Sequence, residues 1–524
     1  MVRVRGALGA AITTVCLLVA AAPAQAAKEC AEPGARWERA TPAEAGMNGA
    51  KLQDAVDYAT TQLAFAVRVY RHGCLVAEDR LAALNRNAKF ESWSMAKSVT
   101  SLVFGRAMTL GLISPDDPVG ALIPEASRKH GAITMRHLLT MTSGLRWNGL
   151  RDYNVFTMPD RVRDALTLGF AHEPGTYFEY AQSAVSLLAE AIERAVGEDL
   201  EAWAKRELTS KLGIRDDAWF WVRDRVGNVG GFYGVNMRPD DFGRLGELLR
   251  RGGVWRGERL LSREYLKEAL APTETNGCYG WLIWLNAGVP CIGPRILNRP
   301  VSDDRDMPGL PHDMYRFSGL FGQLVTVFPS QGIVVVRNGQ DPNLVFSGGQ
   351  GWEHELYRRV LGSVTDQEIP LPEEPVRVNP SRENADAGFL NSLLEPDQYL
   401  KGVVQDPLPP AGPRRARAPQ LLVRTRRASR RGTVAIRLRC PPPLPGREPE
   451  PCRGRATLEG ATRALSYVLD PGEARTLRFR LTSARLRSLR RRASAPFAVT
   501  AVNDDATGGT PARATYTVRR PRGR

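Results

Sequence analysis

The fold and the chemistry of this chain are both organised around one stretch, Phe90-Glu91-Ser92-Trp93-Ser94-Met95-Ala96-Lys97-Ser98-Val99-Thr100. Ser94 and Lys97 stand three residues apart at the start of a predicted helix, where residues at that spacing share one face. The Lys97 amine can therefore take the proton of the Ser94 hydroxyl, which is a weak nucleophile until a base activates it. A helix N-terminus also directs N–H groups toward any anion formed there. One turn thus predicts a nucleophile, a base and part of an oxyanion site.

The same stretch has a purely structural interpretation. Apolar residues recur every three or four positions from Met95 to Ala107, as on the buried stripe of a helix that ends at Gly111. In that interpretation Ser94 is a helix N-cap and Lys97 is a solvated lysine. Two observations favour catalysis: the chain holds nine lysines among 524 residues, and Ser94 is the only serine with a lysine three residues later.

The N-terminus has the pattern of a secretory signal peptide. Arg3 and Arg5 precede an apolar run from Ala7 to Ala22 and the small-residue sequence Ala24-Gln25-Ala26-Ala27. We expect residues 1–27 to be removed from a secreted, extracytoplasmic bacterial protein, with an uncleaved anchor as the alternative. No later apolar run reaches the roughly 20 residues that span a bilayer.

Six cysteines follow the signal peptide, an even number that is typical of disulfides in exported chains. The spacing of the cysteines fits no zinc motif, the six histidines are spread thinly, and no His-Glu-x-x-His occurs. We therefore expect no metal and no cofactor. The cysteines allow 15 connectivities. Proximity favours Cys278–Cys291 and Cys440–Cys452, leaving Cys30–Cys74.

Hydrophobic periodicity predicts a mixed domain over residues 28–368. Strand patterns at both of its ends predict one sheet to which both ends contribute, and residues 155–270 are mostly helical by pattern. A capped helix is expected from Thr134 to Gly144. The other predicted elements are strands Phe65–Tyr70, Cys74–Ala77, Leu324–Phe328 and Ile333–Arg337, and helices Ala184–Val196, Pro239–Arg251 and Trp352–Leu361.

The remainder of the chain differs in composition. Residues 369–418 are rich in proline and predict a linker with a short helix near Ala387 to Leu394. Residues 419–524 show short alternating runs typical of an all-β sandwich. From Ala411 onward there are 27 arginines, no lysine and 7 acidic residues, a net charge of +20, whereas the whole chain carries +16. The basic charge therefore belongs to the C-terminal region.

Three blocks between Trp37 and Gly362 resemble the β-lactamase/penicillin-binding-protein superfamily of serine hydrolases, and look closest to class C-type esterases and 6-aminohexanoate-dimer hydrolases. The resemblance implies a β-lactamase/transpeptidase-like α/β (α+β) domain, with an antiparallel sheet and a helical lobe, ahead of the C-terminal all-β sandwich. The three blocks are Ser92–Ser98, Ile133–Leu145 with Trp147-Asn148, and Ser318–Gln323 running into Val334–Val336.

The resemblance also implies the remaining site residues. Tyr180 matches the tyrosine that helps move the serine proton, and the Lys97 cation would favour its phenolate. Gln182 stands where the family has asparagine or serine, and could hold Lys97 or a substrate carbonyl. Ser318 and Gly319 belong to the third family box, where glycine lets substrate approach. The Leu320 N–H would be the second oxyanion donor, beside that of Ser94.

The third box departs from the family at Phe317, which cannot supply the cation that holds a substrate carboxylate in D,D-peptidases and β-lactamases. That departure argues against both activities, unless Arg316 supplies the charge. Aromatic and polar residues that could line a cleft are Tyr153, Asn154, Trp219, Trp221, Tyr233, Trp281 and Trp284.

The leading hypothesis is an exported serine hydrolase that cleaves a small-molecule ester or amide, or a peptide, through an acyl-enzyme on Ser94. The alternatives are a D,D-peptidase or β-lactamase-type penicillin-interacting enzyme, and a non-catalytic binding protein on the same scaffold. The arginine-rich region suggests attachment to an acidic cell wall or membrane surface, with a merely solvated face as the alternative. It lacks an aromatic stacking platform, so we expect no specific nucleic acid partner.

Overall fold

The computed structural model describes residues 27–153, 158–295, 299–342, 351–376, 382–384, 420–422, 425–429, 431–440, 451–492, 494–503 and 512–521. Nearly all of the predicted signal peptide and most of the predicted linker, including the short helix near Ala387, lie outside the described residues. The domain limits at residues 27, 368 and 418 therefore stay predictions.

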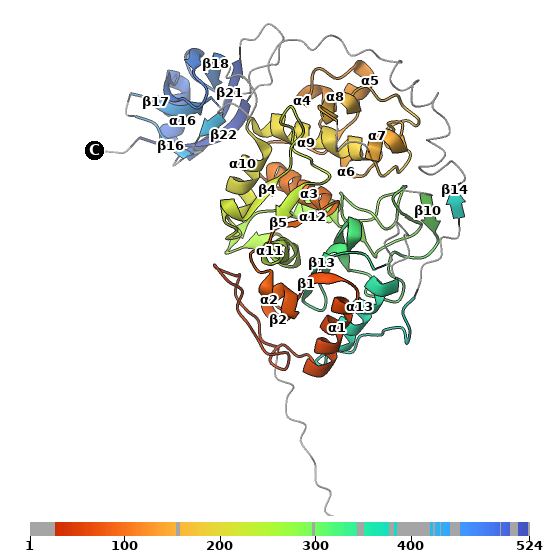
Figure 1. The fold of residues 1–524 in the computed structure, drawn as a ribbon. Coiled ribbons are helices and arrows are strands. Elements are labelled where there is room, and N and C mark those ends of the chain that lie inside the picture. The colour runs from red at the N-terminus through yellow and green to blue at the C-terminus, as the bar shows by residue number, and fades with distance from the viewer. Residues whose placement is uncertain are drawn as a thin grey trace, which may run out of the picture.

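A six-stranded antiparallel sheet is the framework of the first part of the chain (Figure 1). Its strand order is β2-β1-β13-β12-β11-β8, and Val69 of β1 lies opposite Val335 of β13. This confirms the predicted sheet to which both ends contribute. The strands are β1 (Ala64–Arg71), β2 (Cys74–Glu78), β8 (Trp284–Leu285), β11 (Tyr315–Gly319), β12 (Gln323–Phe328) and β13 (Ile333–Gly339).

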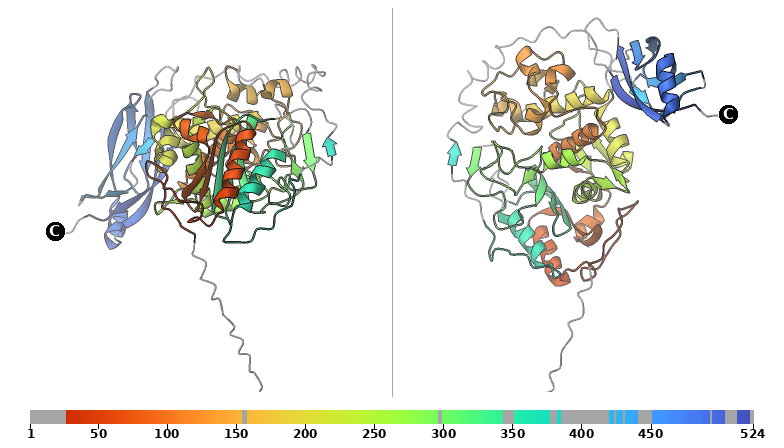
Figure 2. Two further views of the ribbon diagram at one scale, coloured as in Figure 1. Left: turned by 60° about the horizontal axis from the view of Figure 1, so that its bottom comes forward. Right: turned by 180° about the vertical axis from the view of Figure 1, so that it is seen from behind.

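Both faces of the sheet are buried. Val334 and Val336 of β13 join one apolar core, and Ile333 and Val335 join the other. A strand buried on both faces reads as a continuous apolar run, as β13 does. Helices α1 (Gly49–Thr61) and α13 (Gly351–Gly362) lie side by side over one face (Figures 1 and 2). Helices α3 (Met95–Thr109) and α11 (Pro239–Arg250) contact the strands from the other core.

Helix α3 is enclosed on all sides instead of burying a single stripe. Helices α9 (Gln182–Val196) and α12 (Arg263–Ala269) and strand β11 all contact it. Its buried polar side chains are satisfied within this packing: the hydroxyl groups of Ser98 and Thr100 donate to the carbonyls of Leu282 and Gly231 at 2.7 and 2.6 Å. The start of this helix, with Ser94, is therefore held rigidly.

Two local predictions are wrong. The helix capped by Thr134 ends at Leu139 rather than Gly144, because the chain turns through left-handed backbone at Met141 and Gly144. Residues 155–270 also contain short strands among the helices. The remaining elements of this part are helices α2 (Arg80–Leu84), α4 (Val119–Leu122), α5 (Arg128–Gly131), α6 (Met135–Leu139), α7 (Gly149–Tyr153), α8 (Arg161–Ala165) and α10 (Leu200–Ala204), and strands β3 (Phe90–Glu91), β4 (Trp219–Trp221), β5 (Val235–Met237), β6 (Val254–Trp255), β7 (Glu258–Arg259), β9 (Cys291–Ile292), β10 (Arg299–Ser302) and β14 (Arg382–Asn384).

The C-terminal part contains two sheets around one core, of order β15-β17-β20 and β16-β22-β21-β18-β19. The prediction of an all-β unit missed α16 (Ser483–Arg491), which buries Leu489 in this core. Its apolar positions are too few to stand out among arginines. The strands are β15 (Gln420–Leu422), β16 (Thr425–Arg427), β17 (Thr433–Arg439), β18 (Cys452–Leu458), β19 (Leu465–Leu469), β20 (Ala474–Arg480), β21 (Ser494–Asn503) and β22 (Ala512–Arg519).

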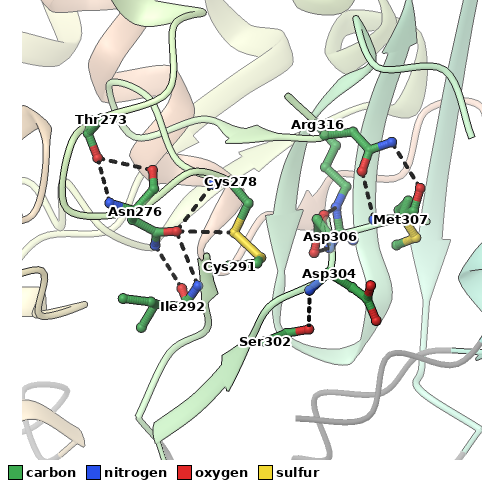
Figure 3. Close-up of a disulfide and its surroundings, with 11 residues drawn as sticks. Thr273, Asn276, Cys278, Cys291, Ile292, Ser302, Asp304, Asp306, Met307 and Arg316 are labelled. Atoms are coloured by element: carbon green, nitrogen blue, oxygen red, sulfur yellow. Dashed lines mark hydrogen bonds and ion pairs between the residues drawn. A yellow bond between two sulfur atoms is a disulfide. The ribbon is translucent and has the colours of Figure 1, made fainter. Parts of the chain in front are cut away.

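All three favoured disulfides are confirmed: Cys30–Cys74, Cys278–Cys291 and Cys440–Cys452. Figure 3 shows how Asn276 organises the second of them. The side-chain oxygen of Asn276 accepts from the N–H groups of Cys278 and Ile292, and its amide donates to the Ile292 carbonyl at 2.8 Å. Among the described residues, no helix combines the length and the apolar character needed to cross a bilayer.

The contact between α11 and the sheet is testable at Gly246. A Cβ atom there would lie 2.8 Å from methyl groups of both Val325 and Val334. We expect Gly246→Val to lower the free energy of unfolding by about 3 kcal/mol through overpacking, measured by urea denaturation. Gly49→Val is the control, because a Cβ there meets only Pro42 at 3.7 Å. Equal effects of the two variants would contradict the packing described.

Candidate active site

The side chains of Ser94 and Lys97 are in direct contact. Lys97 Nζ donates to Ser94 Oγ over 3.0 Å. Ser94 occupies the N-cap position of α3, yet its hydroxyl makes no capping hydrogen bond. Lys97 is 1% exposed and therefore is not a solvated lysine. The interpretation of Ser94 as a helix cap and Lys97 as a solvated lysine therefore does not fit. The contact between the hydroxyl and the amine suits a nucleophile and a base.

Burial changes the chemistry of the lysine. Removal from water lowers the pKa of the Lys97 amine to about 7, although the Asp152 carboxylate opposes that shift. The amine also lies 3.4 Å from the Phe232 carbonyl oxygen and 4.6 Å from the centre of the Tyr180 ring. Near neutral pH a substantial share of Lys97 is unprotonated and can accept the Ser94 proton.

Tyr180 reaches the same point from the segment before α9. It is 6% exposed and hydrogen-bonded to Ser94. Burial raises its pKa well above that of a free phenol, and the bond to Ser94 only partly offsets this. The expected shift toward the phenolate is therefore wrong: burial favours the neutral phenol, and the Asp152 carboxylate acts in the same direction.

The third box lies against the start of α3. A Cβ atom on Gly319 would overlap the Ser92 carbonyl oxygen and lie 3.2 Å from the Met95 nitrogen. Only glycine lets the end of β11 approach this closely. Leu320 follows directly, so its N–H and that of Ser94 belong to adjoining segments. Within the described part of the chain, neither N–H donates to another protein atom.

Each of these N–H groups has a neighbour with left-handed backbone, which sequence reasoning missed. Trp93, just before Ser94, has φ +47°, and Phe321, just after Leu320, has φ +63°. Such a conformation costs roughly 1–3 kcal/mol for a bulky residue and persists only where the surroundings impose it. The two rings meet edge to face with centres 5.2 Å apart. This contact joins the two segments that carry the N–H groups.

Glu91 holds the strained turn in place. Its carboxylate accepts from the N–H of Trp93 at 3.0 Å and from the N–H of Gly234 at 2.7 Å. The amide of Asn236 on β5 donates to it at 2.7 Å. No sequence motif marked Glu91, because its partners are distant in the chain.

Two predicted site residues do not join this cluster through side-chain bonds. Gln182 is 7% exposed, and its side-chain oxygen has no hydrogen-bond partner in the described structure. No bond from Gln182 to Lys97 is present among the described contacts. Ser318 is half-buried on β11, opposite Leu324 of β12.

Neither Phe317 nor Arg316 presents a free cation at the third box. Phe317 is fully buried in the apolar core. Arg316 is neutralised by ion pairs with Asp306 and Glu353, the former at 2.8 Å (Figure 3). Arg316 therefore does not supply the charge that Phe317 lacks.

The expected cleft aromatics are divided between core and site. Trp219, Trp221 and Trp281 are at most 2% exposed and act as core. Trp284 stacks on Tyr180 with ring centres 5.9 Å apart. Asn154 lies outside the described residues. Among those described, no group of three or more His, Cys, Asp or Glu side chains is arranged to hold a metal ion.

The role of Glu91 can be tested through the reactivity of Ser94. We expect Glu91→Ala to release the Trp93 turn, and to slow labelling of Ser94 by a fluorophosphonate at least about tenfold, as loss of an oxyanion donor does. Glu44→Ala is the matched control, because Glu44 accepts the Thr41 N–H at 2.8 Å in another turn. Labelling of folded Glu91→Ala at the wild-type rate would show that the turn does not need this carboxylate.

Parts of this chain are similar in sequence to known proteins. The chain is 27% identical over 149 residues to monacolin J acid methylbutanoyltransferase of Aspergillus terreus, covering 24% of this chain and 36% of that one. It is 26% identical over 154 residues to esterase EstB of Burkholderia gladioli, covering 25% and 39%. These matches span well under half of either relative.

Similar folds occur among solved structures. A Bacillus anthracis protein assigned as a 6-aminohexanoate-dimer hydrolase aligns with a TM-score of 0.48 and 16% identity, over 64% of this chain and 89% of that one. The model of the Beta-lactamase family matches residues 38–353, more than half of the chain. The chain therefore belongs to the beta-lactamase family, and this part has its β-lactamase/transpeptidase-like fold.

Proposed function

We propose that this protein is an exported serine hydrolase that cleaves uncharged esters, and more slowly amides, through an acyl-enzyme on Ser94. The observation that carries the proposal is the 3.0 Å contact between Ser94 Oγ and a lysine amine that is 1% exposed. A buried lysine with a lowered pKa is costly to maintain and is typical of a catalytic base.

Each proton has a route in this mechanism. Ser94 Oγ bonds to the substrate carbonyl carbon, and its proton passes to the neutral Lys97 amine. The N–H groups of Ser94 and Leu320 stabilise the oxyanion. As the bond to the leaving alcohol or amine breaks, the leaving oxygen or nitrogen takes a proton from the Tyr180 phenol. The Lys97 ammonium then returns a proton to Tyr180. Water then attacks the acyl carbon, its proton goes to the same base, and Ser94 regains a proton as the acid departs.

Two observations support an uncharged ester as the substrate: the charges at the third box and the names of the related proteins. Because Phe317 is buried and Arg316 is paired, the site offers no cation to bind a substrate carboxylate. This weighs against the D,D-peptidase and β-lactamase alternative. The esterase and the acyltransferase among the relatives both take their names from ester chemistry. Partly exposed Trp93 and Phe321 beside Ser94 suit an apolar acyl group.

The proposal predicts that Ser94→Ala loses at least 1000-fold in kcat/KM toward a chromogenic short-chain ester, the order expected for a nucleophile. Ser210→Ala is the control, because Ser210 is an exposed serine whose hydroxyl donates to Asp216 and has no part in this mechanism. Equal rates for wild type and Ser94→Ala would end the assignment. Failure of folded wild type to react with a fluorophosphonate would instead favour the non-catalytic binding protein.

The same proposal includes export and surface attachment. Three disulfides suit an extracytoplasmic protein. In the three-stranded C-terminal sheet, Val434, Ile436 and Leu438 face the core while arginines occupy the exposed alternate positions. These arginines face neutral residues across the strands, and no carboxylate partner is described for them: Arg437, Arg439, Arg478 and Arg480. We propose that this face binds the acidic cell wall.

Replacing those four arginines by glutamine should abolish salt-sensitive binding to isolated cell walls, since exposed charge pairing is screened by salt. The matched control changes four exposed arginines of the first part of the chain, Arg86, Arg128, Arg163 and Arg263, and alters net charge equally. Deleting residues 413–524 should act like the first variant. Unchanged retention of either would leave the arginines as a solvated face.

A further inference from the structure

A buried carboxylate that was not predicted from any motif holds the segment that follows Tyr180, whose ring centre lies 4.6 Å from Lys97 Nζ. Asp152 stands on α7 and is 6% exposed. One of its oxygens accepts the Gln182 N–H at 2.9 Å, and the Ser183 N–H also bonds to this carboxylate. Its other oxygen has no hydrogen-bond partner in the described structure. Gln182 begins α9 two residues after Tyr180, so Asp152 anchors the turn that carries the phenol.

We propose that Asp152 is the charge partner of Lys97, acting as a positioning residue that stabilises the ammonium form of the lysine while holding the Tyr180 turn in place. The inference rests on the proposed function, because it assigns Lys97 as the base. It concerns a residue outside the predicted set of Ser94, Lys97 and Tyr180.

The other charges nearby are already paired. Glu179, next to Tyr180, forms an ion pair with Arg295 at 2.9 Å. Asp164 forms an ion pair with Arg151 on the same helix as Asp152. Unlike Glu179 and Asp164, Asp152 forms no described ion pair with an arginine. The cation that acts on its carboxylate is Lys97.

The remaining titratable groups facing Asp152 do not replace that cation. Tyr153 and Tyr180 are phenols whose pKa burial raises well above the usual range, so they stay neutral. Arg161 contacts the Tyr233 hydroxyl, and its backbone N–H bonds Asp224. Facing Lys97 itself, Ser94 and the Phe232 carbonyl are uncharged.

The pair suits a lysine that alternates between charge states. Burial raises the pKa of the Asp152 carboxyl to about 7, close to that of its partner, so a proton can be shared between the two groups. When Lys97 takes the Ser94 proton, an ammonium forms where water cannot stabilise it. A buried charge of that kind needs an opposite charge nearby, which Asp152 supplies.

Asp152 also borders a small polar cavity. Asn148, Ser183 and Ser186 contribute polar side chains to its lining, and neither Ser94 nor Lys97 lines it. Arg146 also lines it, but the charges that act on the Asp152 carboxyl are those of Lys97 and Glu179.

The test is Asp152→Asn in the full-length protein, because an amide oxygen still accepts the Gln182 N–H but carries no charge. The pKa of Lys97 is measured by NMR of ¹³C-labelled lysine, which is practical with nine lysines. We expect a fall of about one pH unit or more, as on loss of a close opposite charge. The acid limb of kcat/KM should move to lower pH by the same amount.

Asp164→Asn is the control, since Asp164 borders the same cavity but is paired with Arg151. It should leave the pKa of Lys97 unchanged. Asp152→Ser, whose hydroxyl can accept the same N–H, is the second variant should the amide fail to fold. An unchanged Lys97 pKa in folded Asp152→Asn or Asp152→Ser would overturn the inference and leave Asp152 as a helix anchor alone.

The outcomes also separate the inference from the proposed function. If Ser94→Ala keeps wild-type activity, the function fails, yet the lysine titration still decides the role of Asp152. If Ser94→Ala is inactive while the pKa of Lys97 is the same in wild type and Asp152→Asn, the proposed function is supported and the inference about Asp152 fails.

Discussion

The candidate site depends on the burial of one amine, that of Lys97. Lys97 sits one turn into a helix enclosed by two other helices and a strand, so water cannot stabilise its charge. Desolvation moves the pKa of its amine toward neutrality, and the same enclosure fixes the amine against the Ser94 hydroxyl. The same packing thus accounts for both the lowered pKa and the contact geometry, and it brings the hydroxyl groups of Ser98 and Thr100 onto carbonyls.

A second constraint acts on the backbone. The end of β11 can meet the start of α3 only because Gly319 has no side chain. Where the two segments meet, Trp93 and Phe321 both adopt left-handed backbone and pack ring against ring. Glu91 accepts hydrogen bonds from Trp93 in one of these turns, from Gly234 and from Asn236 of β5, and so ties that turn to the neighbouring strand. These two strained residues directly flank the N–H groups of Ser94 and Leu320, whose positions the surrounding contacts fix.

Charge is distributed differently in the two parts of the chain. Two arginines near the site are matched to carboxylates, Arg295 to Glu179 and Arg316 to Asp306. Arg337 instead donates to the carbonyls of Phe321 and Gly322. The C-terminal sheet instead exposes arginines opposite neutral residues. The two parts of the chain therefore differ in how far their arginines are paired with acidic residues.

Local pattern was sufficient for much of the fold and for the pairing of Ser94 with Lys97. The hairpin of β12 and β13 and helices α9 and α11 follow from periodicity, and two disulfides follow from closeness in the chain. Cys30–Cys74 is the pair that these two leave. Spacing of three on a helix is a local property, so it places the amine beside the hydroxyl. Pattern was weaker where few apolar residues mark an element, as in α16.

Tertiary structure alone decided the rest, since it depends on contacts between distant segments. Glu91 reaches Gly234, Asp152 reaches Gln182, and the ring of Trp93 reaches Phe321. The protonation of Tyr180 was misjudged because a sequence shows a neighbouring cation but not the extent of burial. Solvent exclusion is a property of the packed molecule, and it determines which buried group carries a charge.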